Sequence, residues 1–275
     1  MKKQKIALVT GDGSAPEMMA QATRIVAKAA ELDGIEIEFV NTPMGWNAFE
    51  RFGDTVPEQS LKMAREMRLV FFGGVGDENN FTDGKQMPYM MPETKINSVI
   101  KDSWWMLERY YPTIFLARLQ QPAESRINKK IVTASQYTFW SETSRVDTRA
   151  DYFEMDYALP NSKIARVNSL GLMSSSAINP DNAMALFQSG AGTVPDLRGQ
   201  NKANPIGRIL AGARMLNWIG ARKGEGAIMY AVATTLEEKI VTHDLLPTMK
   251  LEDLMNSGIR VVGTKEMGDE IFARL

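Results

Sequence analysis

The stretch 5-KIALVTGDGSAPEMM-19 joins a short apolar run to a turn and the start of a helix. Residues 5–10 are a continuous apolar run bounded by charge and glycine, which is typical of a strand buried on both faces in a parallel sheet. The turn at 11–15 follows, Pro16 suits the first helical position, and Glu17 complements the positive end of the helix. The sequence therefore predicts a strand, a tight turn and a helix in this order.

The alternation of strand and helix continues after this unit. A second strand is predicted at 35–43, a helix at 61–68 and a third strand at 69–72, which ends in the glycine-rich run 73–76. This order predicts an α/β sandwich with a mostly parallel sheet. Glycines at the carboxyl end of a strand lie where open α/β sheets bind ligands, although turn formation alone also requires them.

Helical patterns dominate the C-terminal part of the chain. A helix with one apolar face is predicted at 205–220, and a second helix at 226–240. A short edge strand is predicted at 259–262 and a final helix at 264–275, with Thr264 at its start in the spacing of an incomplete capping box. No repeat or linker separates these elements from the N-terminal unit, so we expect them to share its sheet.

Composition bounds the class of protein. The chain has 275 residues, 44% of them hydrophobic, which is enough for a sizeable core. Its 32 basic and 33 acidic residues give a net charge of −1, so no global field favours nucleic acid or an anionic membrane. The absence of cysteine excludes disulfides, thiolate metal sites and a cysteine nucleophile. No apolar run is long enough for a signal sequence or for a membrane span of roughly 20 residues, so a cytoplasmic location is expected.

The stretch 190-GAGTVPDLRGQNKANP-205 is the strongest candidate for a ligand-binding loop. It concentrates glycine, proline, aspartate and asparagine before one helix, more than a plain connection requires. The first turn is a second candidate, because backbone N–H groups at a helix N-terminus suit an anionic or nucleotide ligand. A sharp turn explains the same glycines, and the spacing is not that of a Rossmann fingerprint. The candidate cofactor-binding residues are Gly13 and Ser14 in the first turn and Gly192, Asp196 and Asn204 in the loop.

Charged residues in the middle of the chain are the other candidates. A strand is predicted at 114–119, and Arg109 and Arg118 flank its start. Guanidinium groups suit bidentate carboxylate binding, although either arginine also fits a surface position. Carboxylates gather nearby, at Asp147, Asp151, Glu154 and Asp156. Mg²⁺ prefers such oxygen ligands, but a solvated acidic face is the commoner explanation. The single histidine, His243, is expected to cap a helix or lie on the surface.

Several of these stretches together resemble the β-decarboxylating dehydrogenases, the isocitrate/isopropylmalate dehydrogenase family. The opening 5–19 is similar to that family's first strand and its Gly-Asp-Gly-Ile-Gly-Pro-Glu turn, with Ser14 and Ala15 in place of Ile and Gly. FFGGVG at 71–76 is similar to its glycine-rich strand end. Further similar stretches are NSLGLMSSSAI (168–178), VPDLRGQNKANPIGRILAGARMLNWIG (194–220) and GTKEMGDEIFARL (263–275).

The resemblance implies an isopropylmalate-dehydrogenase-like, two-domain α/β sandwich with a reduced middle domain. Residues 1–98 and 200–275 would form the large domain, and 99–199 a smaller, shortened one that dimerises. In that family NAD or NADP takes a hydride from a 2-hydroxy acid held on Mg²⁺ or Mn²⁺, and the metal then stabilises the enolate as the β-carboxyl group leaves. By this resemblance the candidate catalytic residues are Arg109, Arg118 and Tyr137.

The sequence differs from the family pattern where the chemistry is expected. The segment between Trp140 and Asn168 is too short for the family's catalytic lysine helix and first metal aspartate. The two aspartates of the family's Asp-x-x-x-Asp metal motif correspond to Tyr157 and Asn161 in this sequence. These replacements make binding of Mg²⁺ or Mn²⁺ at the family's metal site doubtful. Loss of general acid–base groups costs roughly 10²–10⁴ in rate each. Asp151 and Asp156 are the candidate ligands of a rebuilt metal site.

We therefore expect a divergent family member with a cleft for a small mono- or dicarboxylate and for NAD(P), in which the usual oxidative decarboxylation is impaired. One alternative is an active NAD(P)-dependent 2-hydroxy-acid oxidoreductase with the rebuilt metal site. Another is a non-oxidative decarboxylase or lyase. The family's assembly implies a homodimer, or a hetero-oligomer with a related subunit.

Overall fold

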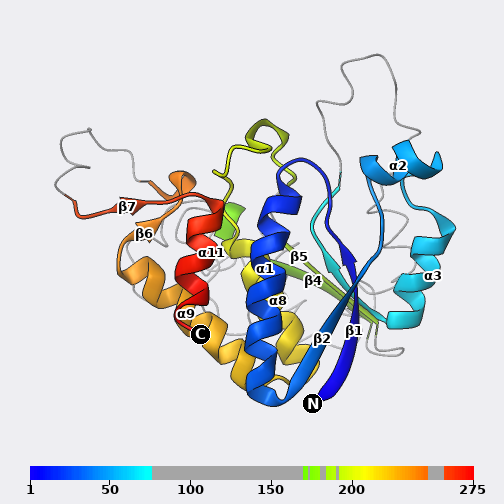
Figure 1. Ribbon diagram of the computed structural model, residues 1–275, viewed down its shortest axis with the longest axis horizontal. Helices are drawn as coiled ribbons and strands as arrows, with labels where there is room; N and C mark the ends of the chain where they lie inside the picture. The colour runs from blue at the N-terminus through cyan, green and yellow to red at the C-terminus, as the bar shows by residue number, and fades with distance from the viewer. Residues whose placement is uncertain (76–169, 173, 180–183, 190–191, 247–256) are drawn as a thin grey trace, which may run out of the picture.

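The structure, a computed structural model, describes residues 1–75, 170–172, 174–179, 184–189, 192–246 and 257–275 (Figure 1). Most of the predicted middle domain, including all of 99–169, lies outside the described residues.

The centre of the molecule is a five-stranded sheet with the order β2-β1-β3-β5-β4. The strands are β1 (Lys2–Val9), β2 (Ile35–Asn41), β3 (Leu69–Phe72), β4 (Ser174–Asn179) and β5 (Met184–Ser189). β1, β2, β3 and β5 are parallel, and β4 is antiparallel to β5. The predicted α/β architecture with a mostly parallel sheet is confirmed. β1 begins earlier than predicted because Lys2 already pairs with Ile35 of β2.

Helices lie on both faces of this sheet (Figure 1). One face carries α1 (Ala15–Ala30), α8 (Ile206–Trp218), α9 (Arg222–Glu237) and α11 (Thr264–Phe272). The other carries α3 (Glu58–Met67), with the short α2 (Trp46–Phe52) beyond its end. The described residues therefore form three layers, with two apolar clusters separated by the sheet.

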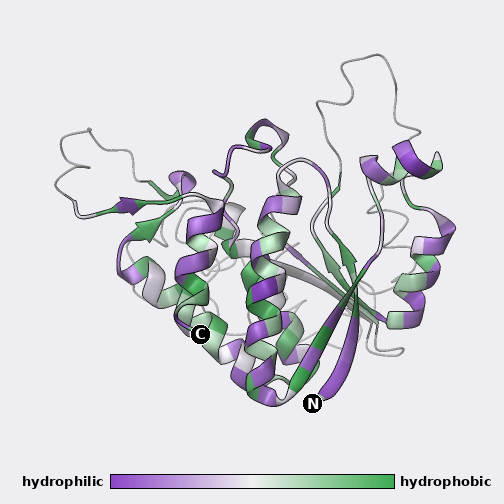
Figure 2. Ribbon diagram, in the orientation of Figure 1, coloured by the Kyte–Doolittle hydropathy of each residue, from purple (hydrophilic) through white to green (hydrophobic). Residues whose placement is uncertain are grey.

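β3 shows why a buried parallel strand has a continuous apolar sequence. Leu69 and Phe71 belong to the cluster on the α1 and α8 side, whereas Val70 and Phe72 belong to the cluster on the α3 side. Successive side chains of a strand point to opposite faces, so a strand covered on both faces needs apolar residues at every position. The lysine-rich start of β1, near the label N in Figure 2, is instead hydrophilic and exposed.

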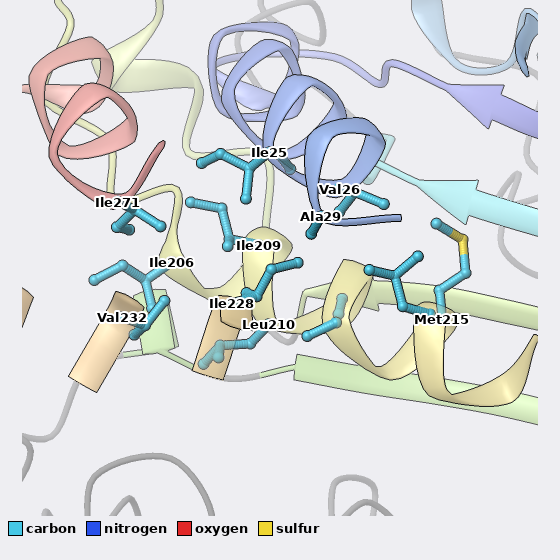
Figure 3. Packing of buried hydrophobic residues seen from close by; sticks show 14 of the residues in the cluster. Ile25, Val26, Ala29, Ile206, Ile209, Leu210, Met215, Ile228, Val232 and Ile271 are labelled. Atoms are coloured by element: carbon cyan, nitrogen blue, oxygen red, sulfur yellow. The ribbon is translucent and has the colours of Figure 1, made fainter. Parts of the chain in front are cut away.

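α8 is the central helix of its layer and is buried on nearly all sides. Every residue in 206–213 is buried, so the expected apolar face is buried and the burial extends beyond it. The reason is that α8 contacts the sheet as well as α1 and α9. Figure 3 shows side chains of these helices and of α11 pointing toward one another. Gly212 permits the close approach of α1, because a Cβ added there would lie 2.2 Å from Cγ2 of Val26.

β4, β5 and α2 are elements that the sequence patterns did not predict. The sequence of β4, SSSAIN, is mostly polar, although its Ser174 and Ser176 are buried. Both β4 and β5 fall in the range 99–199 expected for the smaller domain, yet they continue the sheet of β1 and β3. The boundary expected at 199 therefore does not coincide with the edge of this sheet. The two-domain division itself stays a prediction.

The predicted edge strand at 259–262 is present as β7 (Arg260–Val261). It pairs in parallel with β6 (Ile240–Val241) in a separate two-stranded sheet. β7 precedes α11, and its Arg260 forms an ion pair with Glu270 of that helix. The small sheet is thus connected to the layer that covers the main sheet.

Glu270 contributes stability that depends on pH. Its carboxylate accepts a hydrogen bond from Arg274 at 2.8 Å and another from Arg260, and these contacts lower the pKa of Glu270 below its ordinary value of 4.5. A carboxyl group whose pKa is lowered by folding stabilises the native state above its unfolded pKa, and that stability is lost as pH falls through the folded value.

We therefore expect Glu270→Gln to unfold at lower denaturant concentration than the wild type at pH 7. The difference should shrink as pH falls below 4.5, the ordinary pKa. Urea unfolding of both proteins between neutral and acidic pH measures this. Glu58→Gln is the control, because Glu58 forms an exposed pair whose contribution should be smaller. A difference for Glu270→Gln that is independent of pH would contradict the assignment.

Candidate functional site

The loops that follow β1, β3 and β5 meet at the carboxyl edge of the sheet. Asp12 N–H donates to the carbonyl oxygen of Gly74 at 3.0 Å, and Ser14 N–H donates to that of Thr193 at 2.8 Å. Gly11 has φ +84°, and a Cβ there would lie 2.0 Å from the Gly74 carbonyl oxygen. Only glycine allows this contact between the first two loops. Open α/β sheets bind ligands at this edge, so these loops frame the candidate site.

Gly13 and Ser14 connect the first turn to the loop after β5. The Ser14 hydroxyl is buried and donates to the Thr193 carbonyl oxygen at 2.7 Å, parallel to the bond from its own N–H. Gly13 has φ +58°, and a Cβ on it would lie 2.6 Å from the same oxygen. Both residues therefore position the loop. Their direct contact with a cofactor stays a prediction.

The part of the loop around Gly192 and Asp196 is open to solvent. Gly192 is exposed, and a Cβ added to it would meet no atom within 4 Å. Val194 has φ +45°, a left-handed conformation that is strained for a β-branched residue, and 37% of it is exposed. Asp196 follows in the exposed short helix η6 (Pro195–Leu197). Backbone strain of this kind clusters at functional sites, so this face of the loop is the candidate ligand face.

Asn204 is buried and has both ends of its side chain engaged. Its Oδ1 accepts a hydrogen bond from Ile206 N–H at 3.0 Å, and its Nδ2 donates to Oδ2 of Asp244 at 3.1 Å. Asp244 lies in the short helix η7 (His243–Leu245). Asn204 therefore ties the start of α8 to η7, and the structure gives it this role besides the predicted cofactor contact. His243 is exposed, in agreement with the surface position expected for it.

Glu17 holds the second half of the loop against α1. Its carboxylate accepts hydrogen bonds from the backbone N–H groups of Gly199 and, at 3.2 Å, of Asn201. Gly199 and Asn201 have φ +72° and +54°, so their N–H groups can turn toward one anion. The sequence analysis predicted an interaction of Glu17 with the positive end of the helix, but it did not predict this contact with the loop.

α11 braces the same loop from the other side. The Asn201 side chain donates to Glu266 at 2.9 Å and accepts from Lys265 N–H at 2.8 Å. Thr264 does not cap the helix, because the cap residue is Gly263. The Thr264 hydroxyl instead donates to the carbonyl oxygen of Ala203 at 2.6 Å. Two helices distant in sequence thus fix the loop between η6 and α8.

Arg208 lies beneath two of the loops and is 1% exposed. Its Nε and one Nη donate to the Gly73 carbonyl oxygen at 3.1 and 2.7 Å, and the same Nη donates to that of Gly192 at 3.3 Å. Its other Nη contacts the sulfur of Met18 at 3.0 Å. Burial lowers the pKa of Arg208 to about 10, which leaves it protonated at neutral pH.

The sequence analysis did not select Arg208 or Asp12. Asp12 is buried and its carboxylate accepts from Trp46 N–H at 3.0 Å, so it fixes the start of α2. A signal for Arg208 was available, since Arg208 and Arg214 are the charged residues of an otherwise apolar helix. Arg214 donates to the Ser174 hydroxyl of β4 at 3.1 Å.

The remaining predicted site residues lie outside the part of the chain that the structure describes. They are the candidate catalytic residues Arg109, Arg118 and Tyr137 and the candidate metal ligands Asp151 and Asp156. Among the described residues, no group of three or more His, Cys, Asp or Glu side chains is arranged to hold a metal ion. The same residues contain no helix that is long and apolar enough to cross a membrane.

The architecture defines the class as an α/β protein with a mostly parallel sheet, and its loops form a candidate site at the carboxyl edge of that sheet. The family model described as isocitrate/isopropylmalate dehydrogenase matches residues 5–95 and 162–271, more than half of the chain. The chain belongs to the isocitrate/isopropylmalate dehydrogenase family. The match leaves out the stretch between these ranges, where the candidate catalytic and metal residues lie.

Individual relatives agree with this assignment. The chain is 22% identical to the 3-isopropylmalate dehydrogenase of Desulfotalea psychrophila over 366 residues, covering 99% of this chain and 100% of that protein. It is 23% identical to that of Aquifex aeolicus over 366 residues, covering 100% and 98%. Since the chain has 275 residues, it is shortened relative to these proteins.

Solved structures share the fold. The isocitrate dehydrogenase from Methylococcus capsulatus matches with a TM-score of 0.61 at 18% identity, covering 98% of this chain and 99% of that one. A β-decarboxylating dehydrogenase from Thermococcus kodakarensis also matches with a TM-score of 0.61, at 14% identity and 98% and 96% coverage. The expected isopropylmalate-dehydrogenase-like fold is confirmed.

Proposed function

We propose that this chain binds the adenosine and pyrophosphate part of NAD or NADP at the carboxyl edge of its sheet, and that its metal-dependent oxidative decarboxylation is impaired. The observation that carries the proposal is the bracing of the loop 192–204. Ser14, Glu17 and Asn201 hold this loop by hydrogen bonds to α1 and α11, while its outer face stays open. A preorganised loop binds a ligand with a smaller loss of conformational entropy.

Family membership supports the dinucleotide, since the resemblance places a cofactor contact at Asp196 and Asn204. Asp196 has its side chain on the exposed part of the loop. A carboxylate there repels the additional phosphate of NADP, so the proposal favours NAD.

The shortened middle of the chain supports impaired chemistry. The family match omits the stretch between residues 95 and 162, and the resemblance places Tyr157 and Asn161 at the metal-aspartate positions. Each missing general acid–base group costs roughly 10²–10⁴ in rate. The chain would therefore keep ligand binding after losing catalytic turnover. An NAD(P)-dependent oxidoreductase that uses Asp151 and Asp156 as rebuilt metal ligands is the alternative that the assay below distinguishes.

We expect calorimetry to detect NAD binding to the wild type, weaker NADP binding, and no reduction of NAD in the presence of Mg²⁺ with isocitrate, 3-isopropylmalate or malate. Gly192→Leu should abolish NAD binding without loss of stability, because its Cβ meets no atom within 4 Å and the new side chain would occupy the open face. Gly226→Leu is the matched control, since Gly226 on α9 is equally open but distant in the fold.

Two outcomes would contradict the proposal. Absence of NAD and NADP binding to the wild type would remove the dinucleotide site. Reduction of NAD that requires Mg²⁺ would contradict the proposal that the chemistry is impaired. It would favour the alternative with a rebuilt metal site at Asp151 and Asp156.

A further inference from the structure

Arg208 is a charged residue at a position where packing alone would select an apolar one. Its neighbours in the helix, Gly207 and Ile209, are buried, and Arg208 itself is 1% exposed. Its Nε and Nη groups donate to two backbone carbonyl oxygens and to one sulfur atom. In the described part of the chain no carboxylate pairs with it. Burying a guanidinium without a counter-charge carries a large desolvation cost, so packing alone does not account for this residue.

The contacts of Arg208 connect the loops that frame the site. Gly73 lies at the end of β3, and Gly192 lies in the loop after β5, so one guanidinium group spans the two. A Cβ added to Gly74 would lie 3.7 Å from an Nη of Arg208, which places the charge directly under the glycine turn. The planar fork of arginine suits two acceptors at once, and lysine would not reproduce it.

A second source of positive potential lies at the same edge. α1 begins at Ala15, immediately after the turn that contacts both loops, and its first backbone N–H groups carry a partial positive charge, which the carboxylates of Asp12 and Glu17 offset in part. The buried guanidinium adds a full charge, which solvent screens little. Both favour a ligand that carries negative charge at the loops.

We propose that Arg208 is a positioning residue of the dinucleotide site, which fixes the loops after β3 and β5 and supplies the buried positive charge that selects a pyrophosphate-bearing ligand. This inference rests on the proposed function. It adds the residue on which recognition of the pyrophosphate group depends. Direct contact between Arg208 and the ligand is not required. Arg208 acts by holding the two loops in place and by the positive electrostatic potential of its buried charge.

The test compares ligands that differ in charge but share adenosine. Calorimetric affinities for adenosine, ADP and NAD are measured for the wild type, Arg208→Lys and Arg208→Met. We expect Arg208→Met to lose about tenfold or more in affinity for ADP and NAD with little change for adenosine, a tenfold loss being about 1.4 kcal/mol. Arg208→Lys keeps the charge without the planar fork, so it should lose less affinity for ADP and NAD than Arg208→Met does. Thermal unfolding verifies the fold, and Arg208→Gln replaces Arg208→Met if the latter does not fold.

The outcomes separate the two proposals. Equal losses for adenosine, ADP and NAD in the neutral variant would mean a purely structural role and would overturn the inference, as would unchanged affinities for all three. Failure of the wild type to bind any of the three ligands would instead remove the proposed function, and the inference with it.

Discussion

Alanine in place of Gly13 is expected to cost roughly 3 kcal/mol of unfolding free energy and to weaken NAD binding at the same time. Two effects add: Gly13 has φ +58°, and the new Cβ would lie 2.6 Å from the Thr193 carbonyl oxygen. That oxygen accepts the two bonds from Ser14, so relief of the clash must separate the first turn from the loop. Urea unfolding and NAD calorimetry on the same samples measure both quantities.

Gly34→Ala is the matched control for this change. Gly34 has φ +69°, but a Cβ there would meet no atom within 4 Å. The substitution therefore carries only the left-handed strain, about 1–2 kcal/mol, and should leave ligand binding unchanged. Equal losses of stability in the two variants would show that the contact with Thr193 contributes nothing.

The second large effect is expected at Gly212 in the core. Alanine is the better helix former by about 1 kcal/mol, so the exchange would stabilise an open helix. At Gly212, however, the added Cβ would lie 2.2 Å from Cγ2 of Val26 and 3.4 Å from the Phe71 ring. Overpacking of this kind forces α1 and α8 apart, and we expect a net loss of roughly 2 kcal/mol in urea unfolding.

Gly226→Ala on α9 separates helix propensity from packing. Gly226 lies inside a helix, is exposed and would place its Cβ in open space, so this variant should gain about 0.5–1 kcal/mol. A gain at both positions would show that α1 and α8 are not in close contact at Gly212.

The layered fold was predictable because its strands carry a simple physical signal. β3 was found at its observed bounds, Leu69–Phe72, since burial on both faces requires an unbroken apolar run. β5 has a similar apolar run in Met184–Phe187, but the glycines and prolines nearby favour the prediction of turns over that of a strand. β4 gives no such signal, because its pairing depends on a neighbour rather than on its own sequence.

Part of the geometry of the candidate site was predictable from the sequence. Glycine, serine and asparagine marked two loops that the structure brings into contact at the carboxyl edge of the sheet, through the bond from Ser14 N–H to the Thr193 carbonyl oxygen. Contacts between distant segments, such as Ser14 with Thr193, have no local pattern and needed the structure. Arg208 was missed because helix periodicity assigns a residue to a face and does not say which charged side chain is enclosed when both faces are covered.

The bracing of Asn201 has a consequence for the order in which the protein can assemble during synthesis. Glu17 of α1 is made long before the loop, whereas Lys265 and Glu266 of α11 leave the ribosome after it. The loop can dock on α1 while translation continues, but it lacks its second support until α11 has emerged. The contacts that brace the candidate site are therefore completed late, and a nascent chain that has already made the five strands of its main sheet still lacks the support of α11 for this loop.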